Sequence, residues 1–265
     1  MSNNDNIYTD TPQVLRAFET IFKQLRPEIM QFATTKYHVE EKADGSPVTE
    51  LDVRIEKSIH AYILDKFPDI QVYGEESGYD EKALKGSYWL VDPIDGTQSF
   101  VDNIPTFTSM AVLIEGDEAF ASVIYNHSTD ELYTAIRGKG AYKNGVRLDL
   151  NNTELPKKIL AKDAYIDRLH QLFPDYTFVV APTGAGYGFS QVAEGKVAAR
   201  FQLQSKGYLH DYATGALLVS EAGGQLISTD ESPFNVHSRS FVACHPAFVD
   251  TVQSCRAGLL SIEQS

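Results

Sequence analysis

The sequence has few cysteines and no long apolar stretch, and these shortages exclude several classes of protein. Only two of the 265 residues are cysteines, Cys244 and Cys255, which is too few for a disulfide framework or a cysteine-ligated metal site. No segment approaches the roughly 20 apolar residues of a membrane-spanning helix. The first ten residues hold neither a basic region nor an apolar core, so we expect no secretory signal and a reducing, cytoplasmic setting.

Basic residues are also scarce. The chain has 23 Lys and Arg against 36 Asp and Glu, which gives a formal net charge of −13. A negative field of this size disfavours nucleic acid and anionic membranes as partners. It would also repel a phosphorylated small molecule unless cations intervene. The charge therefore calls for cations wherever a phosphate is to bind, or else is simply an ordinary acidic surface.

Apolar residues recur at helical spacing in two stretches near the N-terminus. The first opens at Thr11-Pro12, because proline suits a first helical turn, and Pro27 within it predicts a kink. Its apolar positions are Val14, Phe18, Ile21, Phe22, Leu25 and Ile29. The second opens at Thr49, and its apolar positions are Ile55, Ile59, Ile63 and Phe67. We therefore expect two amphipathic helices here.

Short apolar runs predict strands along both halves of the chain. In the first half they cover 70–73, 88–92, 109–114, 119–125, 131–136 and 141–148, the last bending at Asn144-Gly145. In the second half they cover 177–181, 197–201, 225–228 and 240–243, with helices after Gly186, from Asp211 and at the C-terminus. The polar segment 149–175 predicts a boundary between halves 1–148 and 149–265. Helices grouped between sheets predict a layered α+β architecture.

The most informative segment is WLVDPIDGT, which runs from Trp89 to Thr97. Its first three residues predict a buried strand, and Pro93 should then end the ladder because it has no N–H. Asp92 and Asp95 would therefore project from the strand end, where carboxylate and carbonyl oxygens can converge. Such oxygens beside backbone N–H groups suit a hard cation that holds a phosphate. Asp-Pro and Asp-Gly are also common turn dipeptides, so the segment alone fits an ordinary tight connection equally well.

Hydroxyl groups accompany these acids. Gly96 permits close backbone approach, and Thr97 places a hydroxyl at an expected helix start. Upstream, Thr49 and Asp52 match a capping box, which is the default explanation of that pair. The functional alternative is that Asp52 accepts a hydrogen bond from Thr97, which would help Thr97 orient or deprotonate an attacking water.

Three further segments carry similar groups, each with a structural alternative. The GEES segment, 74–77, follows a predicted strand and would either ligate a metal or form a solvated acidic turn. Asp211 would serve the site or simply cap a helix. The glycine-rich segment 181–188 lies between strand and helix and would line a substrate pocket or make a tight connection.

Taken together and in this order, the motifs resemble the inositol monophosphatase family of Mg²⁺-dependent, lithium-sensitive phosphomonoesterases. The match to WLVDPIDGTQSF is nearly letter for letter, and GEES, TELD, GKGAYKNG and HDYATGALLVSEAGG fit the same order. The resemblance covers roughly residues 40 to 245. It implies a layered α-β-α-β-α sandwich of the inositol monophosphatase and fructose-1,6-bisphosphatase type, and a homodimer.

The resemblance also implies a role for each functional residue. The first Mg²⁺ would be held by Glu75, Asp92 and the Ile94 carbonyl, and the second by Asp92, Asp95 and Asp211, with a weaker third ion at Glu75. Thr97, paired with Asp52, would activate water, and N–H groups near Gly96 and Thr97 would hold the phosphate. Residues that would support the ligands or border the substrate are Glu76, Gly184, Ala185, Gln204, His210 and Lys42.

Two residues depart from the family pattern and bear on the substrate. His210 stands where the family usually has Trp, and Gln204 stands where inositol phosphatases commonly have a Glu that contacts inositol hydroxyls.

The leading hypothesis is a phosphatase that acts on a small polyol phosphate, with myo-inositol monophosphate as the first candidate substrate. The loop from Lys42 to Thr49 also resembles that of 3′-phosphoadenosine 5′-phosphate and histidinol-phosphate phosphatases. An RNA- or transcription-associated regulator is the alternative of another class, which the acidic charge disfavours.

Overall fold

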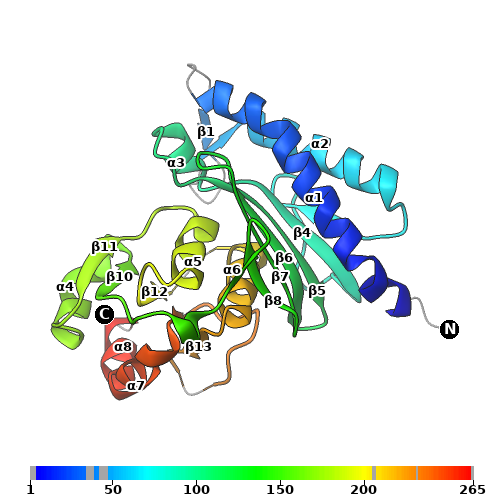
Figure 1. Ribbon diagram of the computed structural model, residues 1–265. Helices are drawn as coiled ribbons and strands as arrows, with labels where there is room; N and C mark the ends of the chain where they lie inside the picture. Colours follow the sequence, from blue (N-terminus) through cyan, green and yellow to red (C-terminus); the bar gives the residue numbers. More distant parts are fainter. Residues whose placement is uncertain (1–3, 34–38, 42–46, 205–206, 231, 264–265) are drawn as a thin grey trace.

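The computed structural model describes residues 4–33, 39–41, 47–204, 207–230 and 232–263. Its helices and sheets alternate in five layers (Figure 1). Helices α1 and α2 cover one face of a seven-stranded sheet, and α5 and α6 lie between that sheet and a five-stranded sheet. Helices α4, α7 and α8 cover the outer face of the second sheet. The expected α-β-α-β-α sandwich is confirmed.

The first layer is a pair of helices, α1 (Asn4–Ala33) and α2 (Glu50–Lys66). Helix α1 begins seven residues before the predicted start at Thr11 and continues through both Pro12 and Pro27. Its predicted apolar face is buried against the seven-stranded sheet. This packing stabilises the helix despite the hydrogen bonds that the prolines remove. Helix α2 begins as predicted, with Thr49 as its N-cap and Asp52 completing a capping box.

The seven-stranded sheet has the order β3-β4-β5-β6-β7-β8-β9. Its strands are β3 (Val72–Gly74), β4 (Ser87–Asp95), β5 (Thr108–Glu115), β6 (Glu118–Asn126), β7 (Glu131–Ile136), β8 (Gly140–Lys143) and β9 (Val146–Leu148). Only β3 and β4 pair in parallel; each later pair is antiparallel. Asn144 (φ 48°) and Gly145 (φ 78°) form the predicted turn between β8 and β9. A separate two-stranded ladder joins β1 (Val39–Glu41) to β2 (Pro47–Thr49).

Strand β4 does not end at Pro93, so that prediction was wrong. Asp92 pairs with Met110 and Asp95 pairs with Thr108, which leaves two residues of β4 opposite one residue of β5. This is a β-bulge, which absorbs the proline by leaving the extra residue out of the ladder. The strand therefore carries both aspartates within its last four residues, all buried, instead of releasing them into a loop.

The five-stranded sheet has the order β11-β10-β12-β14-β13. Its strands are β10 (Lys158–Ala161), β11 (Thr177–Val180), β12 (Ala199–Gln202), β13 (Gln225–Ser228) and β14 (Phe241–Cys244). Four of them were predicted, and β10 was missed inside the polar segment 149–175. The flanking helices are α4 (Asp163–Leu172), α5 (Ala185–Ala193), α6 (Leu209–Glu221), α7 (Val249–Ser254) and α8 (Arg256–Glu263), with short helices at 150–152 and 246–248.

The two sheets fall on either side of residue 149, but their packing is shared. Helix α6 comes from the second half of the chain and contacts strands of the first sheet. One buried cluster accordingly contains Leu90 and Val112 from the first half together with Phe189 and Leu218 from the second. The division into halves at 148/149 stays a proposal. No helix in the described part of the chain is long and apolar enough to cross a membrane.

The close approach of α5 and α6 depends on Gly215. A Cβ atom at this position would lie 2.2 Å from Cδ2 of Phe189, which is buried between the helices. We expect Gly215→Ala to destabilise the protein by about 1–3 kcal/mol, because the added methyl group overpacks this contact. Urea unfolding measures the effect, with Ser220→Ala on the exposed side of the same helix as control. A Gly215→Ala protein as stable as the parent would contradict this account of the packing.

Candidate metal centre

Four acidic side chains from three separate parts of the chain converge at one end of the first sheet. Glu75 follows β3, Asp92 and Asp95 belong to β4, and Asp211 lies in the first turn of α6. Their donor atoms form two overlapping groups in which every pair lies within 4.8 Å. One group joins Glu75, Asp92 and His210; the other joins Asp92, Asp95 and Asp211. Asp92 belongs to both groups, as expected for an acid shared by two cations.

The two β4 acids are almost completely buried, with 2% of Asp92 and 3% of Asp95 exposed. Asp95 accepts hydrogen bonds from the backbone N–H groups of Ala185 (2.7 Å) and Gly186 (2.9 Å) and from the Thr108 hydroxyl (2.7 Å). These contacts place the start of α5 against Asp95, and a Cβ atom at Gly184 would lie 2.9 Å from its carboxylate. By contrast, the Asp92 Oδ1 atom is buried and has no hydrogen-bond partner.

The bulge at Pro93 is held by a hydrogen-bonded pair that sequence reasoning missed. The Ser109 hydroxyl donates to the Pro93 carbonyl (2.5 Å) and lies 2.7 Å from Nε2 of His127. Burial, assisted by Arg26, lowers the pKa of His127 to about 3, so the ring is neutral. Because its Nδ1 atom has no partner, the ring's single proton belongs on Nε2, which donates to Ser109. The pair therefore replaces ladder bonds that the bulge removes.

The position of Glu75 depends on Glu56, a second residue that sequence reasoning missed. The Glu75 N–H donates to the Val91 carbonyl (3.0 Å), and the Glu56 carboxylate accepts from the N–H groups of Glu76 (2.7 Å) and Ser77 (2.8 Å). Glu56 is buried, one turn of α2 after Asp52. An acid between Ile55 and Ile59 on the apolar helix was the signal in the sequence, because a buried carboxylate needs partners.

Asp52 makes both of the contacts considered for it. Its Oδ2 atom accepts from the Thr49 N–H (2.8 Å) in the capping box. Its Oδ1 atom lies 3.4 Å from the Thr97 hydroxyl, which also donates to the Ile94 carbonyl at 3.0 Å. Gly96 directly precedes Thr97. It lies in the left-handed region (φ 82°) and is the N-cap of the short helix α3 (Thr97–Val101). The structure thus brings Asp52 and Thr97 together beside the acids.

Helix α6 supplies Asp211 and His210. The helix begins at Leu209, so Asp211 is its third residue rather than its cap, and its Oδ2 atom accepts from the Tyr208 N–H (2.7 Å). His210 is 1% exposed and faces the acids: its Nε2 atom lies 3.5 Å from Glu75 and 3.6 Å from Asp211. Its Nδ1 atom lies 2.8 Å from the Tyr79 hydroxyl.

Two expected substrate residues lie elsewhere or outside the described structure. The Gln204 side-chain amide donates to the Glu263 carbonyl at the end of α8, and its backbone N–H donates to Ser240 (2.8 Å). Lys42 lies outside the described residues. Their substrate roles stay predictions.

Burial and mutual repulsion make the acids hard to ionise. Burial, with Glu75, Asp95 and Asp211 nearby, raises the pKa of Asp92 well above its usual range. Burial raises the pKa of Asp95 to about 6 against three stabilising hydrogen bonds, and burial also raises the pKa of Asp211. A divalent cation would neutralise these carboxylates, and oxygen ligands suit Mg²⁺. The buried, partnerless Asp92 Oδ1 atom fits such an ion.

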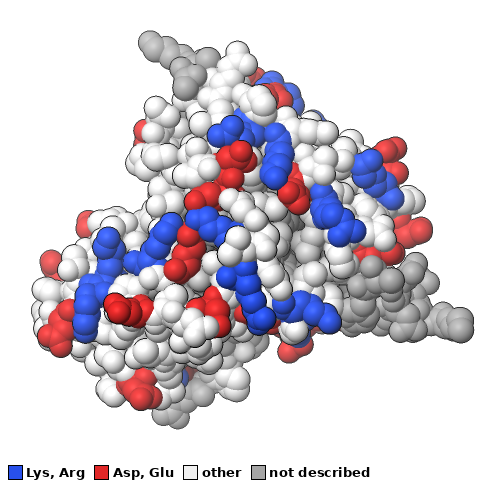
Figure 2. Space-filling view, viewed as in Figure 1, with Lys and Arg blue, Asp and Glu red and all other residues white. Residues whose placement is uncertain are grey.

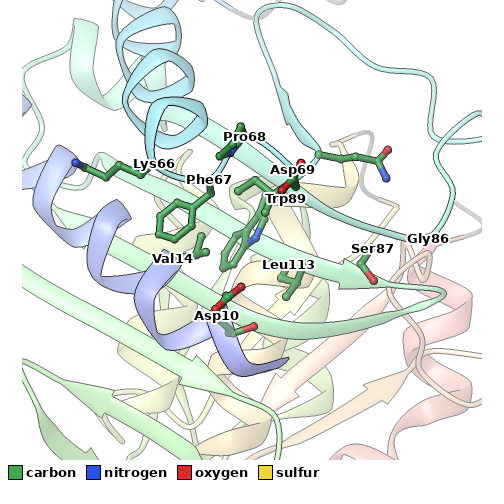
Figure 3. Close-up of a pocket in the computed structure, with 13 residues that line it drawn as sticks. Asp10, Val14, Lys66, Phe67, Pro68, Asp69, Gly86, Ser87, Trp89 and Leu113 are labelled. Atoms are coloured by element: carbon green, nitrogen blue, oxygen red, sulfur yellow. The ribbon is translucent and has the colours of Figure 1, made fainter. Parts of the chain in front are cut away.

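A separate cavity of about 620 Å³ lies between α1, the end of α2 and the beginning of β4 (Figure 3). Val14, Phe67, Trp89 and Leu113 supply its apolar lining. The acids lie toward the other end of β4, where Asp92 is three residues after Trp89, about 10 Å along the strand, and Asp95 is six residues after it, about 20 Å. The cavity is therefore distinct from the metal centre.

Comparison with known proteins agrees with this geometry. The model of the "Inositol monophosphatase family" matches residues 6–257. A curated relative, the fructose-1,6-bisphosphatase/inositol-1-monophosphatase of Aquifex aeolicus, is 30% identical over 76% of this chain and 79% of its own. Nus factor SuhB of Escherichia coli is 34% identical over 69% of this chain and 72% of its own. A solved structure of an IMPase from Thermotoga maritima has the same fold, with a TM-score of 0.81 at 22% identity, covering 92% of this chain and 96% of that one.

The raised pKa values predict how the metal-free protein responds to pH. Because the folded-state pKa of Asp95 is about 6 against an ordinary 3.8, this group favours folding fully below about pH 4, and its contribution is lost as the pH rises through 6. Asp92, whose pKa is also raised, acts in the same direction. We expect Asp92→Asn to stabilise the metal-free protein at pH 8 by on the order of 2 kcal/mol, and by less at pH 5.

Thermal unfolding in EDTA at the two pH values measures this difference. Ser128→Ala, a change of similar size outside the carboxylate cluster, serves as control. A loss of stability in Asp92→Asn of equal size at both pH values would argue that the carboxylate is not under electrostatic strain.

Proposed function

The chain belongs to the inositol monophosphatase family of phosphatases, and from this membership we propose that it hydrolyses the phosphate monoester of a small polyol with Mg²⁺ as cofactor. Myo-inositol monophosphate is the leading substrate. The observation that carries the proposal is the convergence of Glu75, Asp92, Asp95 and Asp211 around a buried Asp92 oxygen that has no protein partner. A cluster of this kind is costly to bury unless cations bind it.

We assign two principal sets of metal ligands. Glu75, Asp92 and the Ile94 carbonyl would hold one Mg²⁺, and Asp92, Asp95 and Asp211 would hold the other, with a weaker third ion at Glu75. Bound Mg²⁺ supplies an acidified water and neutralises charge on the phosphoryl oxygens. The Glu76 side chain adds negative charge close to Asp92, whose pKa it helps to raise.

Thr97 and Asp52 would prepare the attacking water. The capping box occupies Asp52 Oδ2, which leaves Oδ1 to accept from the Thr97 hydroxyl. When Thr97 donates to Asp52, its oxygen lone pairs can accept a proton or a hydrogen bond from water. The present 3.4 Å separation is long, and we expect it to shorten with substrate bound. Backbone N–H groups near Gly96 and Thr97 would hold the phosphate.

Surface charge favours a small phosphorylated substrate over nucleic acid. In Figure 2, Lys and Arg side chains are interspersed with Asp and Glu over the visible face instead of forming a continuous basic stripe. The net charge of −13 acts in the same direction. The similarity to Nus factor SuhB favours one second candidate, a regulator that associates with RNA or the transcription machinery. Binding of RNA at moderate salt would support it.

A substrate panel tests the proposal. Phosphate release with Mg²⁺, with and without lithium, should be compared for inositol 1-phosphate, 3′-phosphoadenosine 5′-phosphate, histidinol phosphate and fructose 1,6-bisphosphate. We expect the highest kcat/KM for inositol 1-phosphate. A higher value for 3′-phosphoadenosine 5′-phosphate or histidinol phosphate would assign the chain to a nucleotidase or histidinol-phosphate phosphatase instead.

Thr97→Ala should lose on the order of 10²- to 10⁴-fold in kcat while Thr97→Ser retains most of it, because only the hydroxyl is required. Near-normal turnover by Thr97→Ala would contradict the proposed activation of water by Thr97 and Asp52.

We also propose that the protein forms a homodimer and resides in the cytoplasm. Exposed apolar side chains support pairing: Ile104 is 47% exposed and Val180 is 53% exposed, and both border a hollow of about 780 Å³ beside α3 and β11. The two cysteines are free, as a reducing compartment permits.

Sedimentation velocity tests the dimer. The parent protein should sediment as a dimer, and Ile104→Asp should convert it to a monomer. A parent protein that sediments as a monomer at micromolar concentration would contradict the pairing.

A further inference from the structure

His210 is a buried side chain that the proposed mechanism does not use. It is 1% exposed, and its Nε2 atom makes no hydrogen bond. A buried N–H group without a partner is destabilising, and a buried nitrogen lone pair without a partner is also unfavourable. The atom nevertheless faces three carboxylate oxygens, at 3.5 Å from Glu75 Oε2, 3.6 Å from Asp211 Oδ1 and 4.0 Å from Asp92 Oδ2. These positions are too distant for good hydrogen bonds.

The same positions suit ligands of a common metal ion. With bonds of about 2.1 Å, neighbouring donor atoms around one ion lie about 3–4 Å apart. The Nε2 atom of His210 meets this condition with Glu75 (3.5 Å) and Asp92 (4.0 Å), and donor atoms of all three residues lie within 4.8 Å of one another. We infer that His210 is a nitrogen ligand of the cation held by Glu75 and Asp92. The inference rests on the proposed function, because it takes these two acids as ligands of one cation.

The surroundings of the imidazole hold it in the orientation that a ligand requires. Tyr208 stacks on the ring at 5.5 Å, and Tyr79 meets it edge to face at 6.0 Å. The Tyr79 oxygen lies 2.8 Å from Nδ1. When Nδ1 carries the proton and donates it to Tyr79, the Nε2 lone pair is left to face the acids. Metal-binding histidines commonly use their second nitrogen in this way, because that hydrogen bond fixes the tautomer and ring position.

A nitrogen ligand changes which metal the site prefers. Carboxylates, carbonyls and water suit Mg²⁺, whereas imidazole favours first-row transition metals. The group of Asp92, Asp95 and Asp211 contains only oxygen donors and suits Mg²⁺. The group with His210 would also accept a divalent transition-metal ion in place of the Mg²⁺ proposed for Glu75 and Asp92. With that ion bound, the centre would hold two different metals, with Asp92 shared between them.

Electron spin-echo envelope modulation of bound Mn²⁺ tests the inference without relying on activity. Mn²⁺ at a fifth of an equivalent is added to the full chain in excess Mg²⁺, which occupies the all-oxygen group. We expect coupling of the Mn²⁺ electron spin to ¹⁴N in the parent protein. His210→Gln should lose this coupling and at least about tenfold of its Mn²⁺ affinity, with a smaller change for Mg²⁺.

Controls separate His210 from other nitrogen sources. His170→Gln, which removes an exposed histidine, should keep the coupling. Tyr79→Phe should keep it with weaker Mn²⁺ binding, because the ring loses the contact that fixes it. Absence of ¹⁴N coupling in the parent protein, or no Mn²⁺ binding, overturns the inference even if a variant fails to fold. So does coupling that persists in folded His210→Gln. Hydrolysis of the substrate panel without ¹⁴N coupling leaves the phosphatase proposal intact and rejects only the nitrogen ligand.

Discussion

The burial of two neighbouring carboxylates on β4 is the constraint on which the site depends. Asp92 and Asp95 are removed from water while Asp211 and Glu75 lie close by, so ionising them in the folded state is unfavourable. The protein compensates Asp95 with two N–H groups at the start of α5 and with the Thr108 hydroxyl. It leaves Asp92 uncompensated. This asymmetry supports the proposal that Asp92 is shared by two cations, since a metal ion would supply the partner that its Oδ1 atom lacks.

The same constraint explains why the two sheets must pack together. The first sheet supplies Asp92 and Asp95, while the second half of the chain supplies Asp211, His210 and the N–H groups at Ala185 and Gly186. Close approach of α5 and α6 places these groups, and small residues permit it: Gly184 lies against Asp95 and Gly215 against Phe189. Core packing and charge placement therefore use the same contacts. A shift of α5 by even an ångström would lengthen the hydrogen bonds to Asp95 beyond their useful range.

Sequence reasoning located the acids but not what holds them. Asp92, Asp95, Glu75 and Asp211 were found because turn-forming and helix-starting residues accompany them in a recognisable order. Local rules failed where tertiary contacts override them. Pro93 was expected to end the strand, yet a bulge absorbs it because Ser109 satisfies the Pro93 carbonyl. Ser109 lies on β5 and His127 directly follows β6, and their pairing cannot be inferred from spacing along the chain.

Other misses have the same origin. Strand β10 lies in a polar segment, and only its position between β11 and β12 in the second sheet reveals why Ile159 is buried. Helix α1 continues through both prolines because its long apolar face is stabilised by packing against the first sheet. Glu56 was overlooked as one acid on an ordinary amphipathic helix. Each of these features depends on a partner more than 15 residues away, beyond the range of propensity and periodicity.

His210 shows how one substitution can separate reaction class from metal preference. The proposed hydrolysis of a phosphate ester relies on the acids, Thr97 and Asp52, and not on the residue that precedes Asp211. An imidazole there brings the Nε2 atom to 3.5 Å from Glu75, where an aromatic hydrocarbon ring would contribute only packing. Since Tyr79 contacts the opposite nitrogen, the ring is already oriented before any ion binds. Preorganised ligands lose less conformational freedom on binding, so this arrangement supports the inference that His210 binds a cation that accepts a nitrogen ligand.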